Sequence, residues 1–131
     1  MTGATWHPGK GHRLAMKNLI ILNEPAYGNE RSYNGLRLAG ALAKREGTAV
    51  KVFLIGDAAS CAKAGQKLPQ GYYHLERMLK VPLLHGAAVG VCGTCMDARG
   101  LAESELGEGA KRSTLEQLAD WTSWADKTLV F

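Results

Sequence analysis

The chain has 131 residues, of which 46% are hydrophobic and 21% charged, and its formal net charge is +4 at pH 7. This length fits one domain with its own core, and no apolar run approaches the roughly 20 residues that a membrane-spanning helix needs. The basic residues are scattered and no nucleic-acid-binding motif is present, so we expect neither a nucleic acid nor a membrane as partner.

The chain reads as a short leader followed by alternating strands and helices. Residues 1–15 are rich in Gly, Pro and His and lack periodicity, so we expect a flexible extension before a single domain of residues 16–131. Hydrophobic periodicity then predicts, in chain order, a strand over 17–22, a helix over 27–45, a strand over 49–55, a helix up to 64, a helix over 72–84, a strand over 87–91, a helix over 114–125 and a strand over 127–131.

Several helix ends carry capping signals. Gly47 follows the first helix as a C-cap residue, and Asp57 is placed to cap the helix that runs to residue 64. Ser113 is expected to cap the final helix, where Glu116 completes a capping-box pattern.

The alternation predicts an α/β fold of the flavodoxin-like, three-layer type with a mostly parallel sheet of four or five strands. Ligands bind such sheets at the carboxyl ends of strands, at the point where the strand order reverses. A strand order of 2-1-3-4 puts that point between the first and third strands. Asn23 and Tyr27 of the first loop, and Asp57 if it is not merely a cap, are therefore candidates for contact with a substrate.

The most informative segment is Cys92-Gly93-Thr94-Cys95, which follows the third strand and opens a predicted helix. A thiol at a helix N-terminus lies where backbone amides favour a negative charge, so its thiolate is expected to be stabilised. Gly93 and Thr94 lie between the two cysteines and are expected to contact the substrate. Arg99 on the same helix is a candidate charge for an anionic sulfur donor.

Three chemistries compete for the two cysteines. Their spacing is shared by dithiol redox motifs and by half-sites for zinc, but no second pair of zinc ligands follows. The third chemistry is nucleophilic, in which a thiolate takes a sulfur atom from a donor as a persulfide and passes it to an acceptor. Cys61, flanked by small residues, is expected to be structural.

The chain resembles the DsrE/DsrF-like family of sulfur-relay proteins, and its YchN-type members in particular, over residues 16–131. The resemblance is carried by five blocks in the same order, namely residues 53–58 (FLIGDA), 64–67 (AGQK), 71–79 (GYYHLERML), 91–100 (VCGTCMDARG) and 108–114 (EGAKRST). It implies a flavodoxin-like fold assembled as a homotrimer or homohexamer. It also implies that Cys92 is the sulfur-carrying cysteine, with Cys95 as an addition similar to the YchN-type pattern.

We therefore expect a small persulfide carrier that exchanges sulfur with donor and acceptor proteins or small sulfur anions. Whether it turns over without a partner stays open, and no cofactor or metal is expected. The alternatives are a homo-oligomeric module that binds a small anion or metabolite with incidental cysteines, and a dithiol redox protein. The odd cysteine count and the absence of a secretory signal favour a cytoplasmic location.

Overall fold

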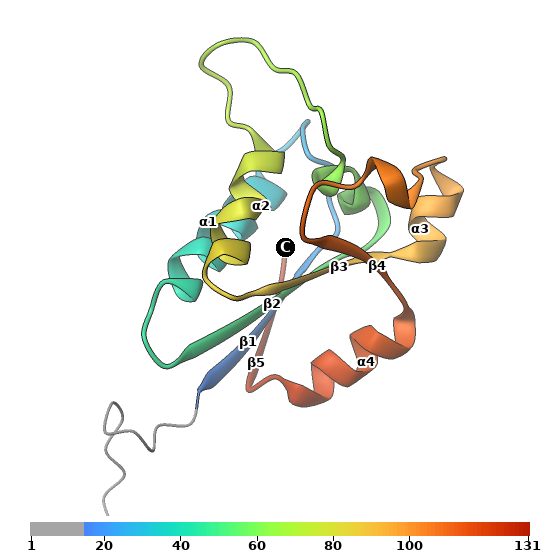
Figure 1. Cartoon of the computed structure of the whole chain (residues 1–131). Helices are drawn as coiled ribbons and strands as arrows, with labels where there is room; N and C mark the ends of the chain where they lie inside the picture. The colour runs from blue at the N-terminus through green and yellow to red at the C-terminus, as the bar shows by residue number, and fades with distance from the viewer. Residues whose placement is uncertain (1–14) are drawn as a thin grey trace, which may run out of the picture.

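The computed structural model describes residues 15–131 and arranges them around one parallel sheet of five strands (Figure 1). The strands are β1 Met16–Leu22, β2 Thr48–Leu54, β3 Ala88–Cys92, β4 Ala110–Ser113 and β5 Lys127–Val130. They lie in the order β4-β3-β2-β1-β5, and every neighbouring pair is parallel. The predicted α/β fold is confirmed, whereas the expected flexible extension lies outside the described residues except for Ala15.

Helices cover both faces of this sheet and complete three layers. Figure 1 shows α1 and α2 together on one face and α4 on the other. In chain order the helices are α1 Arg31–Ala43, the 3-10 helix η1 Gly56–Ala62, α2 Leu75–Leu84, α3 Gly93–Ala98, the 3-10 helix η2 Glu103–Glu105 and α4 Leu115–Trp124. Over residues 15–131, none of these helices has the length and apolar character needed to cross a bilayer.

The alternation of side chains along the central strands explains why both faces are covered. On β2, Val52 and Leu54 face α1 and α2, whereas Phe53 between them faces α4; all three are essentially inaccessible to solvent. The Phe53 ring meets Trp121 of α4 edge to face, with 6.0 Å between ring centroids. Trp121 thus belongs to the core, while the half-buried Trp124 lies 4.2 Å from the ammonium group of Lys51.

The expected strand order of 2-1-3-4 is wrong, because β2 lies between β1 and β3. From β1 to β2, β3 and β4, each strand is placed beside the one before it, in the same direction across the sheet. The chain then passes through α4 back across the sheet, and β5 pairs with the other edge of β1. Right-handed crossovers place helices on opposite faces when the direction changes, which accounts for α4 lying alone. The cysteine segment after β3 is consequently flanked by the ends of β2 and β4, and not by the end of β1.

Two predicted helix starts are also corrected. Ser113 is the last residue of β4, and the N-cap of α4 is Thr114, whose hydroxyl accepts a hydrogen bond from the Gln117 N–H at 3.1 Å. The segment after β2 is a 3-10 helix whose N-cap position, Ile55, makes no side-chain cap bond, so Asp57 is not a cap. β4 was not predicted because its sequence, AKRS, has no apolar run.

Candidate functional site

Cys92 ends β3 and is the N-cap residue of α3, so its sulfur lies at the junction that the sequence indicated. Its Sγ accepts a hydrogen bond from the backbone N–H of Cys95 at 3.3 Å and lies 3.3 Å from the Thr94 hydroxyl oxygen. The first N–H groups of a helix have no partner within that helix. A strand that leads through Gly93 directly into α3 therefore brings the Cys92 sulfur against unpaired donors.

These donors place the pKa of Cys92 below its ordinary value of 9.0. Burial on its own raises this pKa, because it disfavours the thiolate, and Cys92 is only 9% exposed. Hydrogen bonds from the Cys95 thiol, the Thr94 hydroxyl and the backbone N–H groups of both residues outweigh burial. Cys92 is therefore the thiol that ionises first.

The second thiol has the opposite shift. Burial raises the pKa of Cys95, and its hydrogen bond to Cys92 raises it further because the bond needs the Cys95 proton. The N–H of Gly56, 3.1 Å from the Cys95 sulfur, and the charge of Arg99 act in the lowering direction but do not prevail. Of these two neighbouring residues, Cys92 therefore ionises more readily than an ordinary cysteine and Cys95 less readily.

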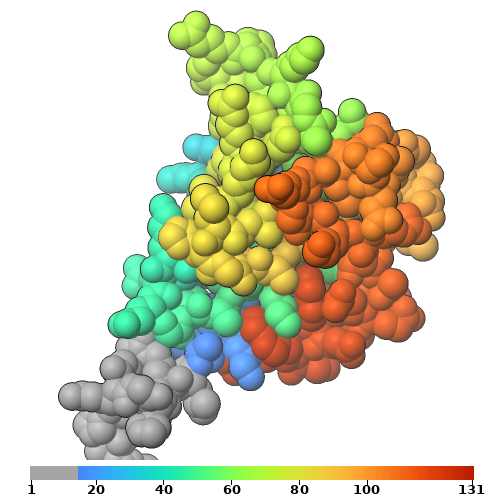
Figure 2. Space-filling model, viewed as in Figure 1, coloured from blue at the N-terminus to red at the C-terminus, as the bar shows by residue number. Residues whose placement is uncertain are grey.

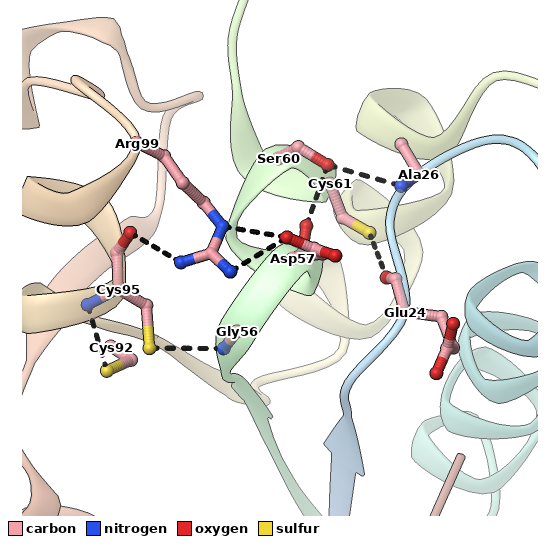
Figure 3. Close-up of polar contacts among 9 residues, drawn as sticks. All are labelled: Glu24, Ala26, Gly56, Asp57, Ser60, Cys61, Cys92, Cys95 and Arg99. Carbon is pink, nitrogen blue, oxygen red and sulfur yellow. Dashed lines mark hydrogen bonds and ion pairs between the residues drawn. The ribbon is translucent and has the colours of Figure 1, made fainter.

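Gly56 is a site residue that sequence reasoning missed. It opens η1, two residues after the end of β2, and has a φ of +61°, a left-handed conformation that glycine adopts without strain. This turn directs its N–H at the Cys95 sulfur from a strand end about forty residues earlier in the chain (Figure 3). In the sequence, Gly56 could be seen only as a glycine after a strand. It could be linked to the cysteines only if β2 was known to lie next to β3.

Arg99 and Asp57, both predicted, form an ion pair beside the cysteines (Figure 3). Nη2 and Nε of Arg99 lie 2.7 and 2.9 Å from one oxygen of Asp57, and Nη1 donates to the Cys95 carbonyl at 3.1 Å. These contacts tie α3 to η1 and so keep Gly56 next to Cys95. The Arg99 guanidinium thus already has protein partners, which makes it a positioning residue in this structure.

A second arginine at the site was not selected from the sequence. Arg112 of β4 forms a bidentate ion pair with Asp97 of α3, with N···O distances of 2.8 and 2.9 Å. The parallel pairing of β3 with β4, in which Cys92 lies opposite Ser113, brings this arginine beside the cysteine segment. No sequence signal marked it, because β4 itself was not predicted.

Asn23 and Tyr27, the other two predicted contacts, lie apart from the cysteines. The Asn23 side-chain amide donates to the Phe131 carbonyl at 3.3 Å, next to β5. The Tyr27 hydroxyl donates to the Gln66 side chain at 2.6 Å and accepts from the Leu75 N–H at 3.2 Å. Tyr27 thus fastens the loop between η1 and α2, which projects from the body of the molecule in green and yellow-green (Figure 2). Both residues follow β1, which the observed strand order separates from β3.

Cys61 is part of the core and is fully buried. Burial raises the pKa of its thiol to about 11, and the sulfur points toward the Glu24 carbonyl rather than toward the other two cysteines (Figure 3). Within residues 15–131, no group of three or more His, Cys, Asp or Glu side chains is placed to hold a metal ion.

Comparison with known proteins identifies the family. The model of the DsrE/DsrF-like family matches residues 16–131. Protein YchN of Escherichia coli K12 is 39% identical over 116 residues, which cover 88% of this chain and 98% of YchN. An uncharacterised protein of Methanocaldococcus jannaschii is 40% identical over 116 residues, covering 88% of this chain and all of that protein.

Solved structures agree with this result. The crystal structure of E. coli YchN matches with a TM-score of 0.83 and 38% identity, covering 88% of this chain and 99% of that chain. A protein of unknown function from Methanobacterium thermoautotrophicum shares the fold, with a TM-score of 0.70 at 11% identity over 88% of this chain and 98% of its own. The resemblance drawn from the five sequence blocks is thereby confirmed, and the chain belongs to the DsrE/DsrF-like family.

Proposed function

We propose that this protein is a persulfide carrier in which Cys92 holds the transferred sulfur. The observation that carries the proposal is the position of the Cys92 sulfur at the start of α3, where the Cys95 N–H donates to it at 3.3 Å. Cys92 accepts hydrogen bonds that favour its thiolate, and Cys95 keeps its proton. Sulfur transfer requires a thiolate nucleophile, and a lowered pKa makes that thiolate easier to form.

The chemistry balances without a cofactor. In loading, the Cys92 thiolate attacks the outer sulfur of a donor persulfide, R–S–SH; a new S–S bond forms, the donor S–S bond breaks and RS⁻ leaves with the electron pair. In unloading, an acceptor thiolate attacks the outer sulfur of the Cys92 persulfide, and Cys92 leaves as a thiolate. The hydrogen bonds that lower its pKa make Cys92 a good leaving group in this second step.

The experiment that tests the proposal is intact-mass spectrometry of the reduced protein after incubation with polysulfide or thiosulfate. We expect the native chain and the Cys61→Ser control to gain mass in steps of one sulfur atom, and the Cys92→Ser variant to gain none. Absence of any adduct on the correctly folded native chain would contradict the proposal. That result would favour the alternative of a module that binds a small anion or metabolite.

The closeness of the two cysteines, with the Cys95 N–H 3.3 Å from the Cys92 sulfur, also supports a second candidate function, dithiol redox exchange. In that case the native chain gains no sulfur but loses two hydrogen atoms on mild oxidation and regains them with a dithiol reductant. The same spectra distinguish the two functions, because an adduct and a disulfide change the mass in opposite directions.

We also propose that the carrier works as a cytoplasmic homotrimer or homohexamer with sulfur-donating and sulfur-accepting partners. The α4–β5 layer supports an oligomer, because Leu115 and Val130 on it are 68% and 63% exposed. Three free thiols fit a reducing compartment. Light scattering of the purified chain is expected to give three or six times the monomer mass, and a monomer mass would contradict this assembly.

A further inference from the structure

Arg112 is fixed beside the cysteine segment although it belongs to a different strand. Asp97 holds it end-on through Nη1 and Nη2. The pair raises the pKa of Arg112 and lowers that of Asp97, so both stay charged over the working pH range. A guanidinium has five N–H donors, and an end-on carboxylate uses two of them. The N–H of Nε and two others remain available to a second anion.

The residue after Cys92 allows this guanidinium to lie against the backbone. A Cβ atom added to Gly93 would come within 2.8 Å of both Cζ and Nε of Arg112 and within 3.0 Å of Nη2. Nearly equal distances to three atoms place the plane of the guanidinium over Gly93. A side chain at position 93 would push the guanidinium aside, so glycine lets the positive charge lie against the residue that follows Cys92. The negative charge of Cys92 accordingly contributes to the raised pKa of Arg112.

The Arg112 guanidinium is also open to solvent. A hollow of about 230 Å³ extends from Arg112 along β3 to Ala87, with Lys111 and Trp121 also in its wall, and neither Cys92 nor Cys95 lines it. The Arg112 side chain is 38% exposed. Arg99 is equally exposed, but its contacts to Asp57 and to the Cys95 carbonyl use three of its five N–H donors, that of Nε included (Figure 3). Arg112 keeps three N–H donors, that of Nε included, for a second anion.

We propose that Arg112 binds the oxyanion group of the sulfur donor, which makes the site selective for donors of the thiosulfate class. The inference rests on the proposed function. The Cys92 thiolate attacks the outer sulfur of thiosulfate, a Cys92–sulfur bond forms, the S–S bond of thiosulfate breaks and sulfite leaves with the electron pair. Arg112 holds the sulfonate oxygens, which become the leaving sulfite, by charge-assisted hydrogen bonds.

The test compares two reagents that report on the same sulfur. Thiosulfate loading, followed by sulfite release and intact mass, measures donor binding and attack. Alkylation of Cys92 by iodoacetamide, which is uncharged, measures only the thiolate. The variants are Arg112→Gln, Arg112→Lys and the control Arg45→Gln, which makes the same change at an exposed arginine after α1, at the opposite end of the parallel strands from the cysteines.

We expect Arg112→Gln to lower the second-order rate constant for loading by thiosulfate about 10- to 100-fold, mainly through weaker binding of thiosulfate, while alkylation changes less than about twofold. Arg112→Lys should restore part of the loss, and Arg45→Gln should behave as the native chain. Equal losses with both reagents, or no loss with either, would overturn the inference. Loading of the native chain by polysulfide but not by thiosulfate would overturn it and leave the proposed function standing. Loading by neither donor would remove both.

Discussion

The Cys95→Ser variant is expected to hold a persulfide on Cys92 at least about tenfold longer than the native chain does. In the native chain the Cys95 thiol can, once ionised, attack the inner sulfur of the Cys92 persulfide. The Cys92–Cys95 disulfide forms, the persulfide S–S bond breaks and HS⁻ leaves. Because the two residues are in contact, this intramolecular attack competes with transfer to an acceptor. The measurement is the time course of the sulfur adduct by intact mass, with released sulfide determined in parallel.

The pH dependence of this decay has a defined sign. The pKa of Cys95 is raised, so its thiolate is scarce at neutral pH and increases as the pH rises toward that pKa. Decay of the native persulfide should therefore accelerate with rising pH, and that of Cys95→Ser should not share this acceleration. The Cys61→Ser control should decay as the native chain does. Equal lifetimes in the native chain and in Cys95→Ser would show that Cys95 does not resolve the persulfide.

The second prediction concerns the two thiols before any sulfur is bound. We expect iodoacetamide at neutral pH to modify Cys92 at least about tenfold faster than Cys95. The rate for each thiol rises as the pH passes its pKa. The Cys92 profile should therefore rise below the ordinary cysteine value of 9.0, and the Cys95 profile above it. Peptide mapping of the alkylated chain over a series of pH values gives both profiles.

A single variant tests the cause of this difference. Cys95→Ala removes the thiol that donates to Cys92, so the pKa of Cys92 should rise and its alkylation at neutral pH should slow by roughly 2- to 10-fold. Cys61 serves as the internal reference, because its burial and raised pKa should keep it unmodified while the chain is folded. A Cys92 profile that does not move in Cys95→Ala would exclude the thiol–thiol hydrogen bond as its cause.

The sequence was sufficient for the parts of the fold that depend on local patterns. Apolar runs located β1, β2, β3 and β5 to within about a residue, and a glycine turn between a buried strand and a helix located Cys92 and Cys95. The strand order could not be obtained in this way, because apolar patterns do not encode the direction in which each crossover steps. β4 was missed because an edge strand of four mostly polar residues has no periodic signature.

The difference between local patterns and strand order also explains which site residues could be predicted from the sequence. Cys92 and Cys95 interact over three residues and could be recognised as a unit in the sequence. Gly56 and Arg112 reach the site only because β2 and β4 flank β3, so the incorrect strand order pointed to Asn23 and Tyr27 instead. Arg99 was expected near the cysteines and lies there. The sequence did not indicate that its guanidinium forms an ion pair with Asp57.

The groups around Cys92 come from two separate parts of the fold, the β3–α3 junction and the edge strand β4. The hydrogen-bond donors that lower the pKa of Cys92 belong to Thr94 and Cys95, within three residues of it at the β3–α3 junction. The Arg112 side chain comes from the neighbouring edge strand, and an edge strand can accept substitutions without disturbing the interior of the sheet. Under the two proposals above, a substitution in β4 would change the preference for a sulfur donor and leave the proposed nucleophile, Cys92, unchanged.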